Sequence, residues 1–173
     1  MISLPSPLHP AIVHFPIVLL LLGAGVTVAA AVFRRWYLPT LAAAILSIGA
    51  LGAIAAVITG EQEAEMAGEL SPQAEKVLDE HEEMAETTRN AAIIAALVAI
   101  ASAALFQFPA VARGAGVLAA LVALGAAYFV AQTGHYGGQL VYKHGVGVNI
   151  SAGQAGTAPA LDVPKDEDGR HGD

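Results

Sequence analysis

The sequence contains no cysteine, and only 13% of its residues are charged. The absence of cysteine excludes disulfides, iron–sulphur clusters held by thiolates and thiol nucleophiles. This charged fraction is low compared with that of soluble domains, in which roughly a quarter of the residues are charged. The composition therefore argues against a single soluble domain.

Four long stretches lack Asp, Glu, Lys and Arg altogether. A helix needs about 20 apolar residues to cross a hydrocarbon core of roughly 30 Å, and each stretch meets that length. The sequence therefore predicts an all-α integral membrane protein, an antiparallel up-down bundle of four transmembrane helices. The stretches without charge run over residues 11–33, 36–60, 90–112 and 114–132.

We expect these spans to form one four-helix transmembrane domain over residues 1–150. Pro10 suits the first helical turn, and Tyr136-Gly137-Gly138 is expected to break the fourth helix. Residues 151–173 are rich in Gly, Ala, Pro and Asp, so we expect a disordered tail. The predicted spans are about 10–33, 38–59, 87–108 and 114–135.

The connector between the second and third spans is acidic, since ten of the fifteen acids lie within residues 61–86. Most of its residues are good helix formers, and the interruptions are at Gly68 and at Ser71-Pro72. The third helix is thus expected to begin near Pro72 and to project several turns beyond the membrane. Helical spacing places His81 on its inner face.

Positive charge on the short connectors predicts the orientation. Arg34, Arg35 and Arg113 lie at one end of the bundle, which the positive-inside bias assigns to the cytoplasm. Both termini are then expected on the outer side. For a bacterial source we expect a multi-pass protein of the inner (cytoplasmic) membrane, in contact with the lipid bilayer.

Five of the six histidines fall at the predicted outer end. Ionisable residues at membrane depth are costly and usually mark function, and imidazole is a versatile ligand for haem iron and transition metals. His9 and His14 are five residues apart, which is about 140° around a helix, so both cannot face one pocket. We expect His9 to cap the helix or to lie at the surface. The five residues are His9, His14, His81, His135 and His144.

The fourth span carries Tyr128, Gln132 and His135 at helical spacing, a polar stripe that should face the bundle interior. For His14 and for this stripe, packing and interhelical hydrogen bonding are alternatives as strong as ligation. For His81, a solvated or hydrogen-bonded histidine is favoured over ligation, and for His144 a turn or surface role is as strong an alternative as ligation.

One histidine from each of the first, third and fourth helices, with His144, could reach a common site. Four-helix bundles build cofactor sites from side chains on facing helices. No Cys-x-x-Cys-His is present, so a haem would be b-type, held without covalent attachment. A transition metal is the alternative, with carboxylates drawn from Glu61, Glu63, Glu65, Glu80 and Glu82.

No phosphate-binding loop, no serine–histidine–acid set and no basic patch for nucleic acid is found in the sequence. We therefore assign no catalytic residue, and the sequence favours a protein that is not an enzyme by itself.

The segment from Leu8-His9-Pro10 to Val13-His14-Phe15-Pro16 and the segment Gly138–Val148 resemble the two ends of a bacterial membrane family, catalogued as domain of unknown function twenty-two thirty-one, over about residues 5–150. The family comprises predicted four-span proteins without an established activity. Some members are joined to Rieske-type or cytochrome-type redox domains, so the resemblance implies a place near electron transfer. The motif residues carried over are His9, Pro10, His14, Phe15 and Pro16, then Gly138, Leu140, Tyr142, His144 and Gly145.

The leading hypothesis is a small membrane protein with a b-type haem near the outer face. It would pass electrons between a carrier such as quinol and a redox or membrane-complex protein on that side. His14 and His135 are the expected axial ligands, with His81 and His144 as substitutes or supporting donors. The alternatives are a structural or assembly subunit without a cofactor and a protein that binds a transition metal.

Overall fold

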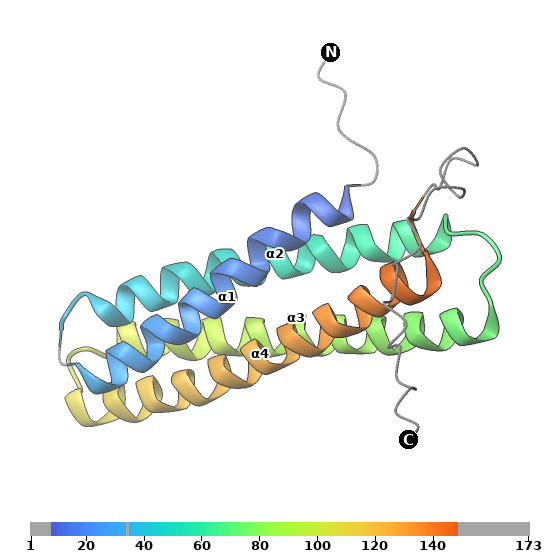
Figure 1. Ribbon diagram of the computed structural model, residues 1–173. Helices are drawn as coiled ribbons and strands as arrows, with labels where there is room; N and C mark the ends of the chain where they lie inside the picture. The colour runs from blue at the N-terminus through green and yellow to red at the C-terminus, as the bar shows by residue number, and fades with distance from the viewer. Residues whose placement is uncertain (1–7, 34, 149–173) are drawn as a thin grey trace, which may run out of the picture.

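The computed structural model describes residues 8–33 and 35–148, and within them it contains four α-helices and no strand. Each helix is long and apolar enough to cross a membrane. Helices consecutive in the chain pack together, and α4 also contacts α1, which closes the bundle (Figure 1). This confirms the predicted membrane bundle, while the tail predicted at 151–173 lies outside the described residues. The helices are α1 (His9–Val32), α2 (Leu38–Glu65), α3 (Pro72–Ala104) and α4 (Pro109–His144).

The start of α3 lies where the sequence predicts it. The Ser71 side chain accepts a hydrogen bond from the backbone N–H of Ala74, 3.2 Å away, and Pro72 occupies the first turn. Proline has no N–H to leave unsatisfied there, and a capping serine satisfies one of the free donors. Gly68 has a φ of 74°, in the left-handed region that glycine adopts at little cost. The acidic connector is therefore mostly helical, as expected.

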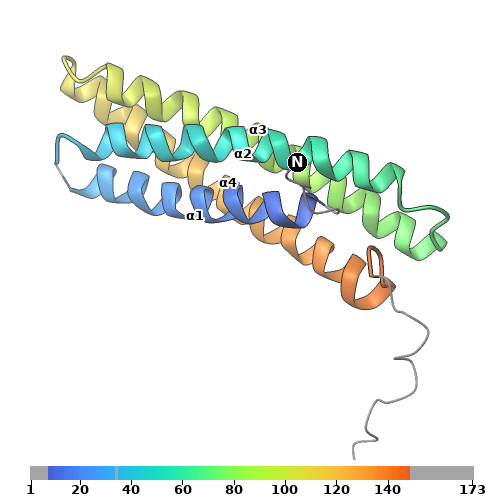
Figure 2. The ribbon, with the colours of Figure 1, turned by 90° about the horizontal axis from the view of Figure 1, so that it is seen from above.

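The hairpin of α2 and α3 extends beyond the rest of the bundle. Both views show the α2–α3 connection lying past the first turn of α1 (Figure 1, Figure 2). We call this end of the molecule, where α1 also begins and α4 finishes, the α2–α3 end. The helices carrying His9, His14, His81, His135 and His144 bring all five towards it.

The predicted break in the fourth helix is wrong. Gly137 and Gly138 both lie inside α4, which continues to His144 and ends where Gly145 adopts a φ of 66°. Glycine inside a helix costs only about 1 kcal/mol relative to alanine, so packing can outweigh its preference. The segment expected to form a separate piece is the last part of one continuous helix.

Small residues fill the centre of the bundle. Leu46 of α2 is fully buried, and many of the other buried side chains are alanines. Gly23 of α1 lies against Leu46 so closely that an added Cβ would be 2.5 Å from the leucine Cδ2. Gly25, two residues later, has no such neighbour within 4 Å. Close helix contact over small residues is what stabilises helix association in membranes, where lipid is as apolar as the side chains.

Gly23→Ala should therefore destabilise the bundle, and Gly25→Ala should not. The added methyl group at Gly23 must displace the buried Leu46 side chain, and such overpacking typically costs about 1–3 kcal/mol. At Gly25 the same change meets open space and improves helix propensity by up to about 1 kcal/mol. Reversible unfolding in detergent would measure the stability of both variants. Equal unfolding midpoints for Gly23→Ala and Gly25→Ala would contradict the close contact between Gly23 and Leu46.

Candidate functional site

Two imidazole rings meet inside the bundle at the α2–α3 end. His9 of α1 and His81 of α3 have ring centroids 6.4 Å apart, with perpendicular ring planes. The two helices lie diagonally across the bundle, because each packs mainly against α2 and α4. Both histidines are half-buried. The rings therefore approach each other across the space between four helices.

The His9 ring is held by α2. Its Nδ1 lies 2.9 Å from the backbone oxygen of Ala56 and 3.3 Å from the hydroxyl of Thr59. A carboxylate oxygen of Glu63 accepts the backbone N–H of His9 at 2.7 Å, which anchors the start of α1. Gly60 faces the ring, and an added Cβ there would lie 3.0 Å from the ring Cε1. Since a carbonyl oxygen can only accept, His9 carries its proton on Nδ1.

The His81 ring is held in the same manner by α4. Its Nδ1 lies 3.0 Å from the backbone oxygen of Thr133, and Gly137 faces the ring. The hydroxyls of Thr88 and Thr133 are 3.0 Å apart and join α3 to α4 beneath the histidine. The proton of His81 is thus also on Nδ1.

This placement of protons gives both rings the same chemical character. With Nδ1–H donated to a backbone carbonyl, the lone pair of each imidazole is on Nε2. Histidines that bind metals commonly donate the other ring N–H to a carbonyl or carboxylate, which fixes the ring and its tautomer. Neither Nε2 has a hydrogen-bond partner within residues 8–33 and 35–148. The pair can therefore offer two neutral nitrogen donors.

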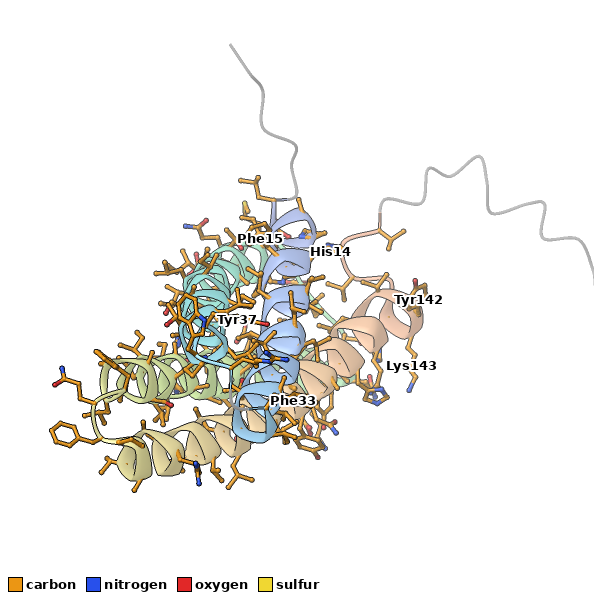
Figure 3. The ribbon with its side chains drawn as sticks, turned by 90° about the vertical axis from the view of Figure 1, so that its left-hand side faces the viewer. His14, Phe15, Phe33, Tyr37, Tyr142 and Lys143 are labelled. Carbon is orange, nitrogen blue, oxygen red and sulfur yellow. The ribbon has the colours of Figure 1, made fainter. Side chains whose placement is uncertain are left out.

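The remaining histidines lie elsewhere on the bundle. His14 is exposed, and its Nδ1 bonds the Pro10 carbonyl of its own helix at 2.6 Å; Figure 3 shows it beside Phe15 near the start of α1. His135 is also exposed, and its ring lies edge-on to Tyr136. His144 is the half-buried last residue of α4.

Of the predicted ligands, the structure therefore places His81 in an interior histidine pair, while His14 and His135 face outwards. The prediction that His9 caps the helix or lies at the surface is wrong, because its ring is half-buried and bonds α2. Two signals could have identified it: the resemblance includes His9 in its motif, and glycines stand on the helices that flank both rings.

The polar stripe of α4 does not face the bundle interior, which corrects a second prediction. Tyr128 is 59% exposed, His135 is exposed and Gln132 is half-buried. The opposite side of α4 carries the buried Ala126 and Val130, together with the threonine and glycine at the His81 ring. These smaller side chains allow α3 and α4 to pack closely, so the bulky polar ones point away.

Burial and neighbouring charges shift the pKa values of two groups at this end, His81 and Glu82. His81 precedes the apolar segment of α3, and burial lowers its pKa below the ordinary value of 6.5; the Thr133 carbonyl raises it in part and His9 lowers it. Partial burial raises the pKa of Glu82, and the negative charges of Asp79, Glu61 and Glu86 raise it further.

No group of three His, Asp or Glu side chains in the described part of the chain is placed to hold one metal ion. Glu63 reaches the backbone of His9, but the acids expected as additional ligands do not complete a set of three with the histidine pair.

Comparison with known proteins identifies the family. A family model described as predicted membrane protein (DUF2231) matches residues 5–150, and the chain belongs to that family. Neither a curated protein nor a solved structure matches the chain.

The tautomers and the lowered pKa of His81 can be measured by ¹⁵N NMR of histidine-labelled protein in detergent. We expect a proton on Nδ1 of both His9 and His81 at neutral pH, and a titration midpoint for His81 below 6.5. The unfolded chain binds this proton more readily, so the contribution to stability is present above pH 6.5 and is lost as the pH falls through the folded pKa. A midpoint at or above 6.5, or protons on Nε2, would contradict this description.

Proposed function

We propose that this member of the family binds a b-type haem between His9 and His81 and acts in electron transfer. The observation that carries the proposal is the pair of rings 6.4 Å apart, each with Nδ1–H bonded to a carbonyl. Following the positive-inside bias of Arg35 and Arg113, we assign the α2–α3 end to the outer face of the bacterial inner membrane.

The number of donors favours haem iron over a bare metal ion. Zinc sites in proteins use three or four protein ligands, whereas the described residues gather two histidines here and no third ligand. A haem supplies four nitrogens from its own ring, so one or two axial side chains suffice. A pair of imidazoles is therefore a complete protein contribution for haem and an incomplete one for a bare ion.

The separation of the rings agrees with this assignment. Imidazole nitrogens bind metals at about 2.0 Å, so two rings on opposite sides of one metal have centroids about 6 Å apart. The observed separation is 6.4 Å. The spacing and the tautomers of the two imidazoles thus fit the two protein ligands of a haem iron.

The same residues indicate what the site would do. A bound haem supplies a one-electron redox couple. His9 and His81 would hold the haem through their Nε2 atoms, and a haem held by two imidazoles would serve electron transfer. We propose a quinol in the membrane as one exchange partner and a redox protein or membrane complex on the outer side as the other. His14 and His135 are exposed and lie outside this pair, whereas the half-buried His144 stays a secondary candidate as a supporting donor.

A structural or assembly subunit without a cofactor is the second candidate, and one observation favours it. His9 bonds α2 and His81 bonds α4, so each ring already makes an interhelical hydrogen bond. Such bonds are worth about 0.6 kcal/mol on average in membrane proteins, up to about 1.7. The transition-metal alternative would require donors beyond the two imidazoles.

An absorbance spectrum of the protein purified in detergent, oxidised and then reduced with dithionite, tests the proposal. We expect sharp α and β bands on reduction. His9→Ala and His81→Ala should each abolish or strongly weaken them, because each removes one axial nitrogen. His14→Ala and His135→Ala are matched controls on the outer surface and should keep the spectrum.

Free imidazole in the buffer should restore part of the spectrum of His81→Ala, because the small ligand can occupy the vacated space. A colourless wild-type protein from cells supplied with haem precursor would contradict haem binding. Elemental analysis would then separate a metal site from the structural role. Loss of the bands in His14→Ala and His135→Ala, with retention in the other two, would contradict the ligand pair.

A further inference from the structure

The two hairpins of the bundle hold their histidines in the same way. In the α1–α2 hairpin, the His9 ring lies on Gly60 and its Nδ1 bonds the carbonyl of Ala56, one turn earlier in α2. In the α3–α4 hairpin, the His81 ring lies on Gly137. Its Nδ1 bonds the carbonyl of Thr133, again one turn before the glycine. We call each such arrangement of histidine, glycine and carbonyl an imidazole seat.

Both seats fit closely against glycine. A Cβ at Gly60 would lie 3.0 Å from the Cε1 of His9, and one at Gly137 would lie 3.1 Å from that of His81. To make room for such a Cβ, the ring would have to move by a few tenths of an ångström, which would lengthen its bond to the carbonyl. Gly134 and Gly138, on the same helix, have no such neighbour within 4 Å. The close contact between a glycine and a ring is therefore specific to the two seats and is not shared by the neighbouring glycines of α4.

We propose that the two hairpins are equivalent half-sites, and that Gly60 and Gly137 are positioning residues that aim one imidazole each at a single shared ligand. The ligand class is an electron-pair acceptor with two positions open to neutral Nε2 atoms. That this acceptor is a haem rests on the proposed function; the equivalence of the seats does not.

Equivalence has a measurable consequence. Each seat is built within its own hairpin, so damage to one should leave the tautomer of the other histidine unchanged. Damage to either should reduce ligand affinity to a similar extent, since each supplies one of two donors. Changing a group that orients a metal ligand typically costs about 10–100-fold in metal affinity.

The experiment compares Gly60→Ala and Gly137→Ala with Gly134→Ala and Gly138→Ala as matched controls. The first readout is ¹⁵N NMR of the protein without haem. Gly137→Ala should remove the Nδ1–H signal of His81 and keep that of His9, and Gly60→Ala should do the reverse. The second readout is titration with hemin, where each seat variant should bind about 10–100-fold more weakly and the controls should bind as the wild type.

These readouts separate the two proposals. If the NMR pattern is as expected and the wild type fails to bind hemin, the proposed haem function is overturned and the equivalent seats stand. If the wild type binds hemin and both seat variants bind it as tightly as the wild type does, the positioning role is overturned and haem binding stands. Unequal losses, with one variant unaffected, would also overturn the equivalence.

Circular dichroism shows whether the variants keep their helices. Alanine favours helix more than glycine does, so any loss would come from the contact with the ring. If a seat variant fails to fold, the NMR spectrum of the wild-type protein still tests whether the seats exist. Nuclear Overhauser contacts from the ring protons of His9 to the α-protons of Gly60, and of His81 to those of Gly137, support the seats, and their absence overturns them.

Discussion

The helices of this protein approach one another over glycine and alanine, and this close approach underlies both its packing and its candidate site. Gly23 admits the buried Leu46, and Gly60 and Gly137 admit the rings of His9 and His81 in the same way. Lipid offers no hydrophobic reward for helix association, so contact distance and interhelical hydrogen bonds must supply it. A larger side chain at any of these three positions would separate helices or displace a ring.

The projection of α2 and α3 determines the environment of the histidine pair. His81 precedes the apolar segment of α3 and is half-buried against α4. Its neighbours are the backbone of α4 and the ring of His9. Burial among these groups keeps the imidazole neutral, and the Thr133 carbonyl fixes its tautomer. The site thus combines a neutral donor nitrogen with a position just before the apolar segment of α3.

The candidate site could be predicted only in part. The gathering of histidines at one end follows from topology, and His81 was expected on the inner face of α3 from its helical spacing. The partner of His81 could not be identified, because His9 and His14 differ by about 140° around α1 and periodicity alone does not say which faces inwards. The apolar surroundings of His14 favour a buried position in a soluble protein, but in a membrane the lipid-facing side is equally apolar.

The sequence by itself determined the membrane class, the number of helices and the start of α3. These depend on charge-free length and on a local capping interaction, such as that of Ser71, which need no distant partner. Tertiary structure alone decided the rotation of each helix, the pairing of His9 with His81 and the continuation of α4 through Gly137. These depend on contacts between residues far apart in the chain, in which a ring from one helix packs against a glycine of another. Local conformational preferences do not encode such contacts.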